Sequence, residues 1–170
     1  MNTPSQKSQD NYLFQNVWNG KKPEIKAQII GFWTALGALP KSAKAEERVE
    51  QVVFVIMDKQ KQVVGVSTVY SALVPTLGFH MLHFRCLIHP EHRQNNLAKD
   101  IVLKTWTHFN EQANSSDSEV NKGIIMEVEN PVINKNKPEA VWTDTQMVYI
   151  GKSSRGLPIR VRYFDGAIIN

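Results

Sequence analysis

The segment FRCLIHPEHRQNNLAKDIVLKTWTHF, residues 84–109, decides the fold, because it joins an apolar run to an amphipathic helix through a polar turn. Apolar side chains recur at spacings of three and four residues from Leu97 to Phe109, which predicts a helix. The first N–H groups of a helix have no intrahelical partner, and the helix dipole adds positive charge there. We therefore expect the turn Arg93–Ala98 to suit a phosphate or pyrophosphate group.

Before this segment, the hydrophobic pattern predicts helices and antiparallel strands. Proline suits the first turn of a helix, so a helix is expected from Pro23 and should end at Gly37. The other expected elements are an edge strand within 11–18, a charged helix over 42–50, strands over 52–57 and 63–70 that form an antiparallel hairpin, and a strand over 79–88. Alternation in the last strand puts Cys86 on its apolar face, as a buried small hydrophobe and not a nucleophile.

Beyond the segment, a loop over 113–122 leads to a strand over 124–130, in which Glu127 and Glu129 share a face. A strand, a helix and a strand in this order predict a parallel crossover, whose ligands bind beside the helix N-terminus. A short helix over 138–142 and a hairpin from 147–149 to 159–164 should close the sheet. The expected fold class is mixed α/β, with a mostly antiparallel central sheet, one parallel crossover and flanking helices.

Composition narrows the class of protein. The 170 residues, 42% of them apolar, predict a single domain over 12–170 behind a flexible N-terminal arm, 1–11. One cysteine excludes an intrachain disulfide, and the absence of a secretory signal or an apolar stretch of roughly 18 residues predicts a cytoplasmic protein without a membrane partner. The net charge of +4 comes without a Lys/Arg block, so nucleic acid is not expected as a partner. A homodimer through the final hairpin is a further expectation.

The order of these elements over residues 12–165, together with Arg93–Ala98 (RQNNLA), resembles the GNAT superfamily of acyl-CoA-dependent N-acyltransferases. The family's pyrophosphate motif is Arg or Gln, two residues, Gly, one residue, then Gly or Ala. Arg93 and Ala98 match its ends, whereas Asn96 stands at the glycine, so the motif is degenerate. Asparagine copies the backbone of glycine better than other residues, while its side chain could obstruct a phosphate or bond it.

The resemblance implies acetyl-CoA or another acyl-CoA as co-substrate. Backbone amides from Gln94 to Ala98 would hold the pyrophosphate, and the backbone of Leu87 and Ile88 would pair with the pantetheine arm. The alternative is an ordinary strand-to-helix turn with Asn95 or Asn96 as N-cap and Arg93 solvated. The coenzyme-binding residues expected in this way are Leu87, Ile88, Arg93, Gln94, Asn95, Asn96, Leu97 and Ala98.

Amide-forming acyl transfer needs a base for the substrate ammonium, a donor that polarises the thioester carbonyl and an acid for the departing thiolate. Glu127 and Glu129 are the candidate bases and His83 is a third. A plain cross-strand ion pair between Arg85 and Glu127 is the alternative. The resemblance places a tyrosine acid late in the chain, but Trp142 stands where it is expected, so Tyr149 or water is the candidate acid.

Other charged features have simpler interpretations. His89 and His92 flank Pro90 without a sequence cluster of carboxylates or cysteines at ligand spacing, so no metal is expected. The final hairpin is basic and is interpreted as a solvated face; its cations are Lys152, Arg155, Arg160 and Arg162.

Three functions from different classes therefore compete. The first is an acyl-CoA-dependent N-acyltransferase acting on a primary amine of a small molecule or peptide. The second is a non-catalytic acyl-CoA-binding or protein-interaction module on the same fold. The third is a basic RNA-associated domain, whose binding would weaken with salt because phosphate contacts release counterions.

Overall fold

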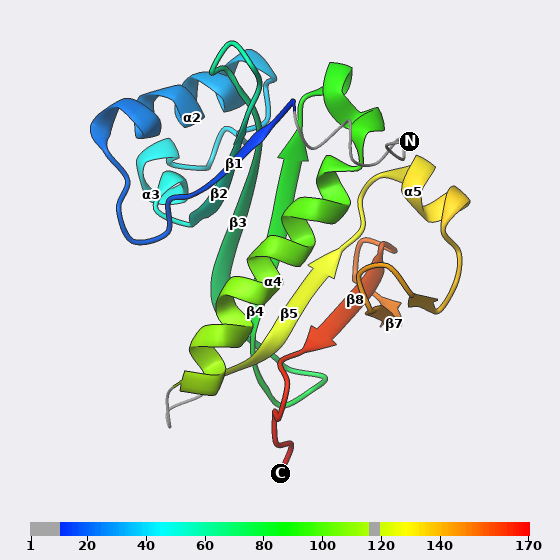
Figure 1. Cartoon of the computed structure of the whole chain (residues 1–170). Coiled ribbons are helices and arrows are strands. Elements are labelled where there is room, and N and C mark those ends of the chain that lie inside the picture. The colour runs from blue at the N-terminus through cyan, green and yellow to red at the C-terminus, as the bar shows by residue number, and fades with distance from the viewer. Residues whose placement is uncertain (1–10, 116–119) are drawn as a thin grey trace, which may run out of the picture. The chain divides into compact units, whose positions relative to one another are not determined.

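The computed structural model describes residues 11–115 and 120–170, so almost all of the predicted N-terminal arm and the centre of the predicted loop 113–122 lie outside the described residues. Eight strands form one sheet in the order β1-β2-β3-β4-β5-β8-β7-β6 (Figure 1). The strands are β1 Leu13–Asn16, β2 Val52–Met57, β3 Val63–Val74, β4 Phe79–Ile88, β5 Asn121–Glu127, β6 Val141–Trp142, β7 Met147–Lys152 and β8 Pro158–Tyr163. The helices are α2 Pro23–Ala35, α3 Ala45–Val49, α4 Leu97–Ser115 and α5 Pro131–Asn136, with a 3₁₀ helix, η1, over Pro90–Asn95.

The chain divides into two compact units, and each is described by itself. The first unit comprises the chain up to Val69 together with Cys86–Thr105. In it α2 and α3 lie beside β1 and β2 (Figure 1). Proline at the first position of α2 fits the predicted start, and Gly37, at φ +60°, follows its end. The buried side chains of α2 pack against those of β2 in one hydrophobic cluster, which includes Ile29, Trp33, Val52 and Val55.

The second unit comprises Tyr70–Arg85 and the chain from Trp106 onward. Its core cluster joins four strands through Val74, Met81, Ile125 and Val161. β5 and β8 approach closely here, because a Cβ atom added to Gly123 would lie 2.3 Å from the carbonyl oxygen of Arg162. Only glycine therefore fits at this position of β5.

Most of the predicted elements are confirmed. β2 and β4 have the predicted bounds, β2 pairs antiparallel with β3, and β4 pairs parallel with β5. The sheet, with one parallel pair and flanking helices, confirms the predicted mixed α/β class. The predicted core stripe of α4 is buried throughout: Leu97, Ile101, Val102, Thr105, Trp106 and Phe109.

Strand bounds were wrong at three places, one of them β7, which continues to Lys152 and does not end at Tyr149. β3 continues to Val74 and does not end at Tyr70, because it alternates through polar Ser71 without a turn residue. β5 begins at Asn121 and ends at Glu127, so Glu129 lies beyond the strand. The antiparallel pairing with β8 sets these limits, since Gly123 faces Tyr163 and Glu127 faces Ile159.

The predicted helix over 138–142 was also wrong. The helix is α5, over Pro131–Asn136, because Asn130 caps it by accepting a hydrogen bond from the Val132 N–H at 2.9 Å. Proline at the first helical position reinforces this start. Trp142 instead belongs to β6, where the guanidinium of Arg160 stacks 4.0 Å above its ring.

Cys86 is exposed, contrary to the prediction of a buried residue. Leu82, Phe84 and Ile88, which alternate with Cys86 on the same side of β4, are buried, so the exposure of Cys86 is local and alternation alone does not predict it. Among the described residues, no helix is long and apolar enough to cross a membrane. The single domain over 12–170 stays a prediction.

Candidate functional site

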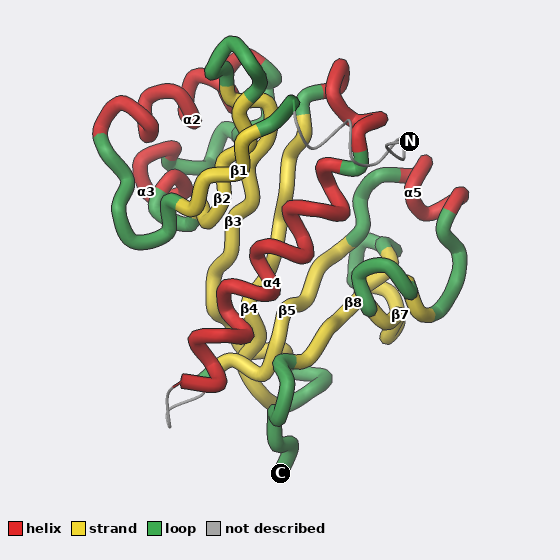
Figure 2. Tube along the Cα trace, in the orientation of Figure 1, coloured by secondary structure: helices red, strands yellow, loops and turns green. Residues whose placement is uncertain are grey.

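The turn that the sequence singled out is built on the end of β4, in the first unit. Figure 2 shows the helical turn η1 directly between β4 and α4. The N–H of His89 donates to the carbonyl oxygen of Val64 in β3 at 2.8 Å, and Nε of Arg93 donates to the carbonyl oxygen of Ile88 at 3.1 Å. These bonds hold both ends of η1 against the end of the sheet.

Asn96 joins η1 to α4 in a left-handed conformation, with φ 57° and ψ 17°. Its carbonyl oxygen accepts the N–H of Asp100 at 3.1 Å, which is the first bond of α4. The three N–H groups between these residues therefore have no intrahelical acceptor. Asn96 is exposed, so this end of α4 faces solvent. The left-handed conformation is the one that glycine favours, and it differs from the extended conformation of an ordinary N-cap residue.

We call the end of β4 together with Arg93–Ala98 the corner, and its other described residues either anchor it to the core or are exposed. Leu97 is only 1% exposed and anchors the start of α4 in the core, whereas Arg93 is exposed. Leu87 packs against the hydrophobic cluster of α2 and β2, and the carbonyl of Ile88 already accepts the bond from Arg93. The side chains of Gln94 and Asn95 lie outside the described parts of the structure.

Two histidines and a carboxylate gather at η1. Potential metal-ligating atoms of His89, Glu91 and His92 lie within 4.8 Å of one another, a proximity that the sequence spacing did not suggest. The N–H of Glu91 donates to Nδ1 of His89 at 3.2 Å, so this nitrogen already accepts a hydrogen bond. His92 is bonded through Nδ1 to the hydroxyl of Tyr12 at 2.7 Å. The expected absence of a metal stays a prediction.

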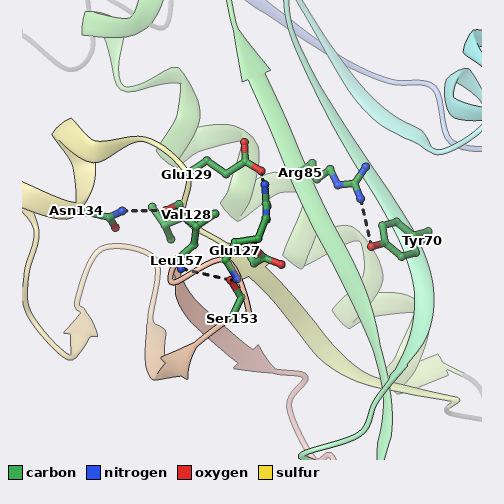
Figure 3. A network of polar contacts seen from close by, with 9 residues as sticks. Tyr70, Arg85, Glu127, Val128, Glu129, Asn134, Ser153 and Leu157 are labelled. Atoms are coloured by element: carbon green, nitrogen blue, oxygen red, sulfur yellow. Dashed lines mark hydrogen bonds and ion pairs between the residues drawn. The ribbon is translucent and has the colours of Figure 1, made fainter. Parts of the chain in front are cut away.

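The two candidate bases meet around one cation in the second unit. The Nη2 atom of Arg155 donates to Oε2 of Glu127 and to Oε1 of Glu129, each at 2.8 Å, and Nε of Arg155 donates to Oε2 of Glu127 at 3.2 Å. Figure 3 shows both glutamate side chains at the end of β5. These hydrogen bonds, first to Glu129 and then to Glu127, raise the pKa of Arg155 above its usual value. We call Glu127, Glu129 and Arg155 the carboxylate cluster.

Arg85 does not form the ion pair with Glu127 that the sequence offered as an alternative. Its guanidinium lies over the ring of Tyr70 at 5.1 Å and donates to the Tyr70 hydroxyl at 3.3 Å (Figure 3). The cation that binds Glu127 comes instead from the turn between β7 and β8, which sequence alternation could not place beside β5.

His83 also contacts Tyr70, and the two rings are stacked with their centroids 4.9 Å apart. Burial lowers the pKa of His83, and Arg85 lowers it further, while a backbone hydrogen bond to Ala72 and the charge of Glu127 oppose the shift. Its Nε2 atom is buried without a hydrogen-bond partner. Burial therefore favours the neutral form of His83, whose ring stacks on that of Tyr70.

Tyr149 lies on the face of the sheet opposite Glu127. It is opposite Arg160 in the β7–β8 register, and Arg160 in turn is opposite Met126 in β5. Residues opposite one another across antiparallel strands share a face, so Tyr149 shares the face of Met126 and not that of Glu127. The structure brings the two glutamates together and does not bring Tyr149 to them.

The basic hairpin is not a uniformly solvated face, so that expectation was wrong. Arg160 is only 4% exposed and donates to the carbonyl oxygens of Glu139 and Ala140 at 2.8 and 3.1 Å. Arg162 lies 3.4 Å above the ring of Trp106 and donates to the carbonyl oxygen of Thr145. These arginines fix the hairpin from within, because aromatic rings and backbone carbonyls supply their partners.

Solved acetyltransferases are similar to the chain in structure. The ribosomal-protein-S5-alanine acetyltransferase from Vibrio fischeri has a TM-score of 0.65 at 13% identity, covering 93% of this chain and 96% of that one. A GNAT-family acetyltransferase from Streptococcus pneumoniae has a TM-score of 0.60 at 10% identity, covering 90% and 99%. The chain has the GNAT fold. No protein-family model matches the sequence, and no curated protein matches it.

The GNAT fold is shared with a structure described as AtaTR bound with AcCoA, which has a TM-score of 0.58 at 8% identity and covers 93% of this chain and 96% of that one. In the GNAT fold of this chain, Arg93–Ala98 spans the end of η1 and the start of α4, at the helix start where the sequence placed it. Sequence reasoning missed Arg155 as the partner of the glutamates. The only signal was its place in a Ser-Ser-Arg-Gly turn, which carries no information on the neighbouring strand.

Proposed function

We propose that the chain is an acyl-CoA-dependent N-acyltransferase that moves an acetyl or other acyl group to a primary amine of a small molecule or peptide. One observation carries the proposal. Asn96 adopts the left-handed conformation that the glycine of the pyrophosphate motif would supply, at the exposed start of a helix. Asn96 therefore keeps the backbone conformation that the motif requires, although it is not glycine.

The corner supplies the chemistry that a pyrophosphate needs. The N–H groups of the first turn of α4 have no acceptor within that helix, and the helix dipole adds positive charge there. Arg93 adds a full charge beside them. In this proposal the amides from Gln94 to Ala98 hold the pyrophosphate, and the backbone of Leu87 and Ile88 pairs with the pantetheine arm.

The carboxylate cluster supplies the base. Glu127 or Glu129 takes a proton from the substrate ammonium, directly or through water, and the free amine attacks the thioester carbonyl. The C–N bond forms, the nitrogen loses its second proton to solvent as the C–S bond breaks, and the thiolate of coenzyme A leaves and takes a proton. That proton comes from water or from Tyr149. Water is the better supported donor, because Tyr149 lies on the face of the sheet opposite Glu127.

Calorimetric titration with acetyl-CoA and with desulfo-CoA tests the coenzyme site without requiring turnover. Asn96→Glu places a negative charge at the helix start and should abolish saturable binding, whereas Asn96→Gly keeps the left-handed backbone and should bind at least as tightly as the parent chain. Equal binding by both variants would remove the corner from the proposal. No binding by the parent chain at millimolar ligand would overturn it.

A non-catalytic acyl-CoA-binding or interaction module is the second candidate. It is favoured by Arg155, which occupies both glutamates, and by the absence of tyrosine from α5. This module would bind coenzyme and release no thiol with any amine of a broad panel. Thiol release with one amine, lost in Glu127→Gln, would exclude it.

A further inference from the structure

The carboxylate cluster already holds a cation in the position of an amine substrate. One nitrogen, Nη2 of Arg155, lies 2.8 Å from a carboxylate oxygen of Glu127 and 2.8 Å from one of Glu129. A primary ammonium group carries three N–H donors and could make the same two bonds from the same point. Arg155 therefore occupies the place that the proposed acceptor must take.

We propose that Arg155 is an internal competitor for the acceptor site, and that the acceptor is a dication, an amine bearing a second ammonium or guanidinium group. The inference rests on the proposed acyl transfer for its choice of reacting nitrogen. The competition itself concerns only the binding of a cation to Glu127 and Glu129.

Charge balance selects a dication. With Arg155 in place, the carboxylate cluster carries two negative charges and one positive charge. A monoamine that displaces Arg155 replaces one cation with another and gains no charge neutralisation. A tethered side chain also competes at an effective concentration in about the millimolar range. A diamine can place one ammonium in the position of Nη2, bonded to both carboxylates, and its second ammonium beside the negative charge that remains, so it outcompetes a single tethered guanidinium.

The Arg155 side chain is free to leave. It is 59% exposed, and its partners Glu127 and Glu129 are 38% and 67% exposed. Exposed ion pairs of this kind contribute little net stability, because water solvates the separated charges well. A ligand therefore meets only a small opposing free energy when it replaces the guanidinium.

The turn that carries Arg155 keeps its shape without the arginine side chain. Oγ of Ser153 accepts the N–H groups of Arg155 and Leu157, each at 3.3 Å (Figure 3 shows the bond to Leu157). The N–H of Ser153 donates to the carbonyl of Leu157, and Gly156 adopts a φ of +76°. Replacement of the arginine side chain should therefore empty the position without moving β7 or β8.

Binding of 1,5-diaminopentane and of its monoamine counterpart, pentylamine, tests the proposal by calorimetry or NMR titration in the absence of acyl-CoA. The parent chain should bind the diamine at least about tenfold more tightly than pentylamine. Arg155→Gln should bind pentylamine about tenfold more tightly than the parent chain does. The difference in affinity between the diamine and pentylamine should therefore be smaller in this variant. Lys44→Gln, which removes an exposed lysine paired with Glu47, is the matched control and should change neither affinity.

Equal affinity of the parent chain for the two amines, or no gain of pentylamine binding in Arg155→Gln, would overturn the proposal. Glu127→Gln should weaken diamine binding, and unchanged binding would move the ligand away from the carboxylate cluster and overturn it as well. Thiol release from acetyl-CoA is then measured separately. Diamine binding without thiol release would contradict the proposed acyl transfer and leave the binding proposal intact. Thiol release at equal rates with both amines would contradict only the proposal that the acceptor is a dication.

Discussion

The turn around Asn96 and the carboxylate cluster around Arg155 are built from different parts of the chain. The first is formed by consecutive residues and offers main-chain N–H groups that follow one left-handed residue. The second relies on side chains, and its cation lies 28 residues from Glu127 and 26 from Glu129. A main-chain site tolerates changes of side chain as long as the backbone conformation survives. A side-chain site fails with a single substitution.

The largest expected effect lies in the carboxylate cluster. Glu127→Gln should lower the rate of acyl transfer about 10²-fold or more, because the amide cannot accept the ammonium proton. Glu129→Gln should cost less, since Glu129 lies beyond the end of β5 and shares only one bond with Arg155. Steady-state thiol release with saturating amine measures both. Equal rates for the parent chain and both variants would remove the glutamates from the chemistry.

A smaller loss, of affinity for acetyl-CoA, is expected from a substitution in the turn before α4, because several hydrogen-bond donors there would bind the same ligand. Arg93→Gln should weaken acetyl-CoA binding by about tenfold or less, since the main-chain donors remain. Calorimetry in low and high salt would separate the two contributions. Abolished binding in Arg93→Gln would mean that a side chain, and not the backbone, dominates this site.

The next prediction concerns the stability of α5, whose cap is a contact between residues close in the sequence, unlike the contacts of the carboxylate cluster. Asn130→Ala removes the acceptor for the Val132 N–H and should lower the free energy of unfolding by about 1 kcal/mol. Asn136→Ala, at the other end of the same helix, is the control and should have a smaller effect. Urea denaturation gives both values, and an equal loss in the two variants would contradict the assigned cap.

The smallest effect concerns His83. Burial favours its neutral form, so its pKa should lie below 6.5, the value for an unperturbed imidazole. A lowered pKa in the folded state contributes stability above pH 6.5, and this contribution is lost as the pH falls through the folded pKa. NMR titration of the ring protons gives the pKa directly. His83→Gln should flatten the acid side of the stability profile, and a measured pKa above 6.5 would contradict the burial argument.

The same contrast explains what the sequence could predict. The bounds of β2 and β4 and the start of α4 follow from local hydrophobic pattern, and so does the turn that ends at Asn96, because its residues are contiguous. The special backbone of Asn96 was accessible too, since asparagine tolerates the left-handed region. Family resemblance supplied the choice of ligand.

Features that depend on strand order could not be predicted in this way. The pairing of β5 with β8 brings the Arg155 turn to Glu127, and no local pattern shows which strands are neighbours. The face on which Tyr149 lies depends on the register of β7 with β8, which the sequence around Tyr149 does not show. The misplaced final helix has a local cause, because the Asn130-Pro131 pair is a helix-start signal that precedes Pro138 and was overlooked.

The hydroxyl of Tyr12 reaches His92 in η1 across 80 positions of sequence, at the very start of the described chain. Shortening the protein from its N-terminus past this tyrosine would release one restraint on the turn that precedes α4, although no residue of that turn would be altered.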